Sequence, residues 1–256
     1  MKIIKTMVEN NAAMIVLGNH EYNAVCYHTK SNGGDFFLRQ HSNRNTRNHR
    51  ETLNAFANYQ KEWAEYLLWF RTLPLYIDLQ SIRIVHACWD DSIVTFLEKR
   101  LKNAVMDEEF LHRSSIPGSV EYKAIETLLK GYEVYLPPGY YYCDRDGNTR
   151  TKIRVRWWKS FNSETYRSIS LSNDKALPES LIPETKLQRF SSYNSDKKPV
   201  FFGHYWNTGK PEILKPNVCC VDYSLAKREK LVAYRWDGEQ TLTNENFISQ
   251  ECIDFA

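Results

Sequence analysis

The stretch MIVLGNHEYN (residues 14–23) decides the fold class and the expected site, because an apolar run leads directly into polar side chains. Residues 14–17 are typical of a short buried strand, and Gly18 ends the apolar run. Asn19, His20 and Glu21 then present an amide, an imidazole and a carboxylate in a row, for which core packing gives no reason. We therefore predict a strand over Met14–Leu17 that ends at a functional loop, with Gly18 allowing a sharp backbone turn.

Two other apolar strands are predicted to end in the same way. The segment SIRIVHA (residues 81–87) predicts a strand over Ile82–Val85 that stops at His86, and KPVFFGHYW (198–206) predicts a strand that stops at Gly203 and His204. Loops at strand ends of layered α/β folds converge into sites. An amide oxygen and two imidazoles suit a borderline divalent metal such as Mn²⁺, Fe²⁺, Zn²⁺ or Ni²⁺. Asn19, His86 and His204 are therefore candidate metal ligands.

Composition restricts the class of protein. The chain has 256 residues, 42% of them hydrophobic and 25% charged, which is typical of a soluble globular protein. A formal net charge of +3 is too small to indicate a nucleic-acid or membrane partner. We find no apolar run of about 18 residues and no signal peptide. The six cysteines form no CxxC pair, so reduced thiols and a cytoplasmic location are expected.

Helices and strands are interleaved along the chain, which indicates an α/β class with mixed sheets. In TKIRVRWWK (residues 151–159), Ile153, Val155 and Trp157 alternate with basic residues, as in a strand with one buried face. The segments NVCCVDYS (217–224) and KLVAYRWDGE (230–239) are expected to pair as antiparallel strands. Helices are predicted over residues 2–11, 53–70, 92–102 and 121–131, a polar loop or lid over 31–50, and a flexible insertion over 160–198.

The motifs GNHE, VHA and FGH, in this order, resemble those of the calcineurin-like metallophosphoesterases. LLKGYEVYLPPGYYYCDRDG (residues 128–147), IRVRWW (153–158) and VFFGHYW (200–206) resemble a bacterial branch of this superfamily that is similar to protein phosphatases. The resemblance covers nearly the whole chain. It implies a single domain over residues 1–256 with an αββα sandwich of two mixed sheets.

The resemblance also implies a function. The chain would be a metal-dependent phosphoesterase that hydrolyses phosphate esters or dinucleoside polyphosphates at a dinuclear centre, with manganese as the first expected metal. Asn19, His86 and His204 would bind one metal, and His20 would donate a proton to the leaving oxygen. Glu21 would organise the ligands without binding the metal. The expected partner is a phosphorylated small molecule or a phosphoprotein, with no nucleic acid and no membrane.

The family pattern contains two aspartate-bearing segments upstream of GNHE, Asp-x-His-Gly and Gly-Asp-x-x-Asp, and this chain has neither. The resemblance therefore implies an N-terminally truncated domain without its first strand-helix units. The bridging aspartate would be absent, so we expect weak metal binding and impaired activity. The alternative is a non-catalytic remnant that binds a phosphorylated ligand or a partner protein. The missing strands would leave a sheet edge exposed, which favours self-association.

Two weaker features remain open. Arg156, beside the Trp157–Trp158 pair, is a candidate for binding phosphate, although a solvated strand face explains the basic residues equally well. The polar segment 31–50 is either a cationic lid or hydrated surface. The histidines outside strand ends are not expected to bind metal: His28, His41, His49 and His112.

Overall fold

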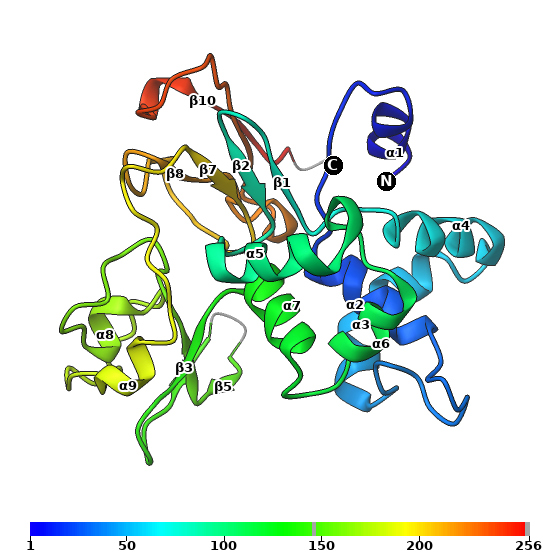
Figure 1. Ribbon diagram of the computed structural model, residues 1–256, viewed down its shortest axis with the longest axis horizontal. Coiled ribbons are helices and arrows are strands. Elements are labelled where there is room, and N and C mark those ends of the chain that lie inside the picture. Colours follow the sequence, from blue (N-terminus) through cyan, green and yellow to red (C-terminus); the bar gives the residue numbers. More distant parts are fainter. Residues whose placement is uncertain (145–146, 254–256) are drawn as a thin grey trace. The chain divides into compact units, whose positions relative to one another are not determined.

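The computed structural model describes residues 1–144 and 147–253, which form a mixed α/β protein with about 35% helix (Figure 1). This agrees with the α/β class that the sequence predicts. The chain divides into two compact units, the first made of Met1–Ile77 and Ile93–Ile125, the second of Asp78–Ser92 and Glu126–Ala256. No helix in the described part of the chain is long and apolar enough to cross a membrane.

The first unit is helical, with a core of aromatic side chains. Trp63, Tyr66 and Phe70 are buried on one face of α4, at the spacing that an amphipathic helix requires. Tyr22 on α2 reaches Ser114 on α6, with 2.9 Å between the two hydroxyl oxygens. The helices are α1 (Lys2–Glu9), α2 (Asn19–His28), α3 (Asn43–Ala55), α4 (Gln60–Phe70) and α6 (Glu108–Ser114), together with α5 (Asp91–Arg100) and α7 (Val120–Lys130), which both cross the division between the units.

Two predictions for this unit are wrong. Residues 14–17 form no strand: Leu17 is fully buried and its N–H donates to Pro74 O at 2.8 Å, whereas Met14 is 65% exposed. The single helix expected over residues 53–70 is two helices. Phe56 ends α3 and packs against Trp63 of α4, with 4.8 Å between ring centroids, so the break lets an aromatic ring enter the core.

The second unit contains β2 (Arg83–Val85), β7 (Val200–Phe202) and β8 (Val218–Cys220), which belong to a four-stranded mixed sheet in the order β1-β2-β7-β8; β1 (Tyr76–Asp78) begins in the first unit and ends in the second. Strands β2 and β7 run parallel, as do β7 and β8, so the carboxyl ends of these three strands lie at one edge of the sheet. All three residues of β8 are buried, which is typical of a parallel strand covered on both faces.

The antiparallel pair expected near the C-terminus is also wrong. Strand β8 pairs with β7, while β9 (Lys230–Tyr234) pairs with β10 (Phe247–Glu251). The physical reason is burial: β8 is apolar on both faces, whereas β9 buries only Val232 and suits a two-stranded hairpin.

The rest of the second unit consists of short elements. Ile153, Val155 and Trp157 are fully buried, as the alternating pattern predicts. Gly131 ends α7 with φ = 82°, and a Cβ at this position would lie 2.1 Å from Tyr205 Oη, so only glycine fits. The remaining elements are the hairpin of β3 (Glu133–Tyr135) with β6 (Lys152–Arg154), the hairpin of β4 (Tyr142–Cys143) with β5 (Thr149–Arg150), and the short helices α8 (Tyr166–Ile169) and α9 (Glu184–Leu187).

Candidate metal centre at the strand ends

Two histidines meet at the carboxyl ends of neighbouring parallel strands. His86 directly follows β2, and His204 lies two residues beyond β7. The N–H of Gly203 donates to His86 O at 2.9 Å, which extends the pairing of the two strands to the site. His86 Nε2 and His204 Nδ1 are 3.2 Å apart, with ring planes inclined by 58°. The structure therefore brings two of the three candidate metal ligands into contact.

The spacing of these two nitrogens fits a shared metal ion. Two imidazole nitrogens at about 2.0–2.1 Å from one ion, with roughly 90–109° between them, lie about 2.8–3.4 Å apart. Without an ion, the same distance is an ordinary N–H···N hydrogen bond in which one ring donates. Within residues 1–144 and 147–253, no group of three or more His, Cys, Asp or Glu side chains is arranged to hold a metal. Among the described residues, the pair therefore offers two imidazole ligands and no third His, Cys, Asp or Glu ligand beside them.

The backbone at the second histidine adopts an uncommon conformation. His204 has φ = 68° and Trp206 has φ = 51°, both in the left-handed region that residues other than glycine rarely occupy. Each residue in this conformation raises the free energy of the folded chain by about 1–3 kcal/mol, and such residues cluster at functional sites. The flexibility expected of Gly18 and Gly203 is not used, because Gly18 is extended and Gly203 has no positive φ. A Cβ on Gly203 would make only ordinary contacts, at 3.6 Å and beyond. The turn is made by His204 itself.

Asp222 holds this left-handed loop and was missed in the sequence analysis. It follows β8, the next parallel neighbour of β7, and is half-buried. Its carboxylate accepts hydrogen bonds from the N–H groups of Trp206 at 3.3 Å and Ser224 at 3.1 Å, and its carbonyl oxygen accepts one from Asn207 N at 3.0 Å. The prediction that VCCV is half of an antiparallel pair separates this aspartate from His86 and His204, although all three are polar side chains at the end of an apolar strand.

The loop after His86 is fixed by buried hydrogen bonds. Ala87 N donates to Leu128 O at 2.9 Å, and the indole N–H of Trp157 donates to Ala87 O at 3.0 Å. Burial raises the pKa of the neighbouring Cys88 thiol well above its ordinary value, so this cysteine remains protonated. The backbone that carries His86 is therefore held by hydrogen bonds on both sides of Ala87.

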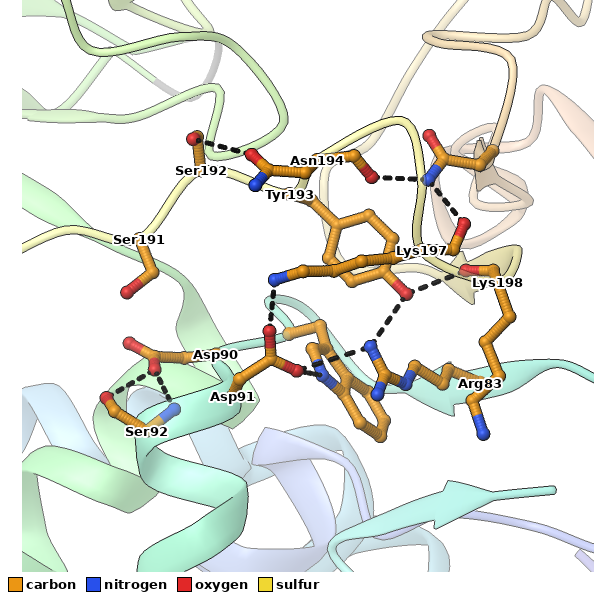
Figure 2. Close-up of polar contacts among 12 residues, drawn as sticks. Arg83, Asp90, Asp91, Ser92, Ser191, Ser192, Tyr193, Asn194, Lys197 and Lys198 are labelled. Atoms are coloured by element: carbon orange, nitrogen blue, oxygen red, sulfur yellow. Dashed lines mark hydrogen bonds and ion pairs between the residues drawn. The ribbon is translucent and has the colours of Figure 1, made fainter. Parts of the chain in front are cut away.

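An ionic cluster joins the loop after β2 to the segment before β7 (Figure 2). The Arg83 guanidinium lies 3.2 Å from Asp91 Oδ1 and 3.1 Å from Tyr193 Oη, and it stacks over Trp89 at 4.6 Å. Lys197 forms an ion pair with Asp91. Although burial opposes ionisation, hydrogen bonds from Lys197 and Trp89 hold the pKa of Asp91 below its ordinary value. Because Arg83 begins β2 and Lys197 precedes β7, this cluster braces the two strands that end in histidine.

Asn19, His20 and Glu21 form the first turn of α2 in the first unit. Glu21 occupies a position where a carboxylate interacts favourably with the helix dipole, which gives it an ordinary structural role. His20 is exposed and Asn19 is half-buried. The approach of these three residues to the histidine pair stays a prediction.

The remaining candidates are also located. Arg156 is half-buried, its Nη2 donates to Asn173 Oδ1 at 2.9 Å, and burial lowers its pKa. Its role in binding phosphate stays a prediction. In the segment 31–50, residues 43–50 belong to α3, which begins after the cap Ser42, so only the first part is a loop. The lid and the flexible insertion over 160–198 remain predictions.

No family model, curated protein or solved structure matches the chain. Function is therefore inferred from the side chains themselves and from the motif resemblance.

Proposed function

We propose that the chain is a metal-dependent phosphoesterase in which His86 and His204 hold a divalent ion, with manganese as the first candidate. The observation that carries the proposal is the 3.2 Å contact between His86 Nε2 and His204 Nδ1 at neighbouring parallel strand ends. The left-handed backbone at His204 supports it, since strain of this kind persists where the surrounding structure maintains it for function. When bound, the ion supplies Lewis-acid polarisation of a phosphate oxygen.

The other residues have supporting roles in this proposal. Asn19 supplies an amide oxygen as a third ligand, and His20 donates a proton to the leaving oxygen of the ester. Glu21 orients the first turn of α2, and Arg156 is a weaker candidate for contact with the phosphate. The proposal includes the αββα sandwich of two mixed sheets that the motif resemblance implies.

Activity is expected to be low, because the described ligands are neutral. Two imidazoles and an amide offset none of the ion's charge, and carboxylates are the usual means of doing so. The same site without turnover would bind a phosphorylated ligand or partner, and the experiment below distinguishes the two.

The test measures Mn²⁺ binding by equilibrium dialysis and hydrolysis of p-nitrophenyl phosphate in parallel. His86→Ala and His204→Gly should each weaken Mn²⁺ binding at least about tenfold, with a matching loss of hydrolysis. Glycine is chosen at position 204 because it tolerates the left-handed backbone. His112→Ala removes an imidazole outside the pair and is the control. If neither substitution changes the affinity for Mn²⁺, His86 and His204 do not form the proposed metal site.

His20→Ala separates chemistry from binding. It should lower kcat about 10²–10⁴-fold with Mn²⁺ content unchanged, since a proton donor acts on the leaving group alone. An unchanged kcat would exclude His20 as the donor. Mn²⁺ binding without any hydrolysis by the wild-type chain would overturn the catalytic part of the proposal and favour a binding role.

A further inference from the structure

A cavity of about 800 Å³ lies in the second unit, and no function has been assigned to it above. Its volume is within the range of about 300–1,000 Å³ that is usual for small-molecule sites. It is formed by three segments, residues 160–163, α9 with the adjoining Gln188, and residues 190–194, all within the expected insertion over residues 160–198. Its lining residues are Ser160, Phe161, Asn162, Ser163, Glu184, Leu187, Gln188, Phe190, Ser192 and Asn194.

The lining chemistry disfavours an anionic ligand. Three serine hydroxyls, three side-chain amides and one carboxylate face the cavity, and none of the described residues that line it is a lysine or arginine. A phosphate or carboxylate ligand would lack the cation that such anions normally require. Hydroxyls and amides each donate and accept hydrogen bonds, so they match a ligand whose own groups do both.

The aromatic side chains provide one flat ring surface and do not form two parallel rings between which a ligand could stack. Phe190 stacks on Tyr132 with 4.5 Å between centroids, which covers one face of the Phe190 ring. Phe161 lies 5.7 Å from Phe190 and is tilted by 56°. A flat base held between two parallel rings therefore has no place here. A single apolar surface surrounded by hydrogen-bonding groups suits a sugar ring, which has C–H groups on its faces and hydroxyls at its edge.

The wall formed by residues 190–194 is held from behind (Figure 2). Tyr193, whose neighbours in sequence, Ser192 and Asn194, line the cavity, is buried. Its hydroxyl donates to Lys198 O at 2.7 Å and accepts from Arg83 at 3.1 Å. The side-chain amide of Asn217 donates to Asn194 O at 2.7 Å. These contacts fix the backbone on either side of Tyr193.

A second anchor holds the aromatic platform. The Tyr132 hydroxyl donates to the buried Asp90 carboxylate and accepts from Ser191 N at 3.2 Å. Tyr132 in turn stacks on Phe190. The platform and the wall are thus pre-organised, which reduces the entropy that a ligand must give up on binding.

We propose that this cavity binds a neutral polyhydroxylated ligand, a pyranose sugar, with its ring on Phe190 and its hydroxyls on the side chains of Asn162, Gln188 and Asn194. The three amides are solvent-exposed and accessible from outside. The proposal goes beyond the phosphoesterase activity and does not depend on it, because binding is measured without metal or turnover.

The experiment uses the full chain and saturation-transfer-difference NMR with the α-methyl glycosides of glucose, galactose and mannose, each titrated for affinity. At least one should bind saturably with a Kd of about 1–10 mM. Adenosine, titrated in the same way, should bind more weakly than that glycoside, and inorganic phosphate, added as a competitor, should not displace it.

Gln188→Ala should weaken the binding of that glycoside at least about fivefold, because it removes one hydrogen-bonding group without disturbing the core. Gln250→Ala removes a similarly exposed amide from β10 and should have no effect. Phe190→Leu should also weaken binding, with its thermal unfolding measured alongside. The proposal is overturned if no glycoside saturates below about 50 mM, if adenosine binds better, or if Gln188→Ala leaves the affinity unchanged.

Discussion

The chain contains two histidine pairs with nearly equal nitrogen separations. His86 Nε2 and His204 Nδ1 are 3.2 Å apart in the second unit, and His28 Nε2 and His49 Nε2 are 3.4 Å apart in the first. The strand-end pair lies in loops, with His204 in the left-handed region. The helical pair lies on α2 and α3, where His28 Nε2 also accepts a hydrogen bond from the indole N–H of Trp63 at 3.1 Å.

The separation between two histidine nitrogens does not by itself define a metal site. In the helical pair, the indole N–H of Trp63 donates to His28 Nε2, which is the atom that would bind an ion, and His49 Nε2 lies 3.4 Å from the same atom. Burial, followed by the charges of His28 and Arg39, lowers the pKa of His49 from 6.5 to about 4, so this ring is neutral at pH 7. We therefore interpret the helical pair as structural and keep the strand-end pair as the proposed metal site.

The largest change in Mn²⁺ affinity is expected when both histidines of one pair are substituted. The double variant His86→Ala/His204→Gly should weaken Mn²⁺ binding about 50-fold or more, because the ion loses both imidazole ligands. The double variant His28→Ala/His49→Ala is the matched control and should leave Mn²⁺ affinity unchanged. Titration calorimetry of both proteins measures the difference, and equal losses in the two would remove the distinction between the pairs.

A smaller effect is expected from the residue that supports the strand-end loop. Asp222→Ala removes the acceptor for the N–H groups of Trp206 and Ser224, so the loop that carries His204 should loosen and Mn²⁺ affinity should fall about tenfold. Asp222→Asn retains one carbonyl acceptor and should recover part of the loss. The exposed Asp237→Ala serves as the control in the same calorimetric assay. If Asp222→Ala binds Mn²⁺ as the wild type does, Asp222 has no positioning role.

Trp63→Phe tests the structural pair. The change keeps an aromatic ring in the core but removes the N–H that donates to His28 Nε2, so the free energy of unfolding should fall by about 1–2 kcal/mol. Mn²⁺ affinity should not change. Urea denaturation followed by circular dichroism gives the stability, and an unaltered unfolding midpoint would show that this hydrogen bond contributes nothing.

The smallest effect is a pH dependence in the first unit. The pKa of His49 is about 4 in the folded chain, against an ordinary 6.5, so the unfolded chain binds a proton more readily. The stability that this group provides is complete above pH 6.5 and is lost as the pH falls towards 4. Besides His28 and Arg39, His20 and His41 act on His49 by the same repulsion.

Urea unfolding at pH 7 and pH 5 checks this dependence. His49→Gln should lose less stability than the wild type on acidification, whereas His112→Gln, which retains His49, should lose as much as the wild type. An identical loss in His49→Gln and the wild type would contradict the prediction.

Local pattern was enough to predict the strands that lead to His86 and His204, the helices around α1, α5 and α7, and the buried face of Ile153, Val155 and Trp157. These features depend on periodicity and on strand-end polarity, which a single segment carries. The α/β class follows from the same evidence.

The break between α3 and α4 at Phe56 is a local error, whereas the errors in the strands involve pairing between distant segments. A short apolar run such as MIVL or VCCV does not specify its partner, so one predicted strand is absent and another, β8, lies beside β7. The role of Asp222 depends on that pairing, and the left-handed conformation of His204 depends on its surrounding contacts. The cavity could not be predicted from the sequence, because most of its lining residues lie in loops that have no periodic pattern.

Electron spin-echo envelope modulation of the Mn²⁺-loaded chain tests most directly the proposal that one ion is held by two imidazoles at the strand ends. The account predicts ¹⁴N modulation from coordinated imidazole in the wild type and in the His28→Ala/His49→Ala variant. The modulation should diminish in His86→Ala or His204→Gly and disappear when both are changed. No imidazole modulation in the wild type, or modulation that persists in the His86→Ala/His204→Gly double variant, would contradict the claim.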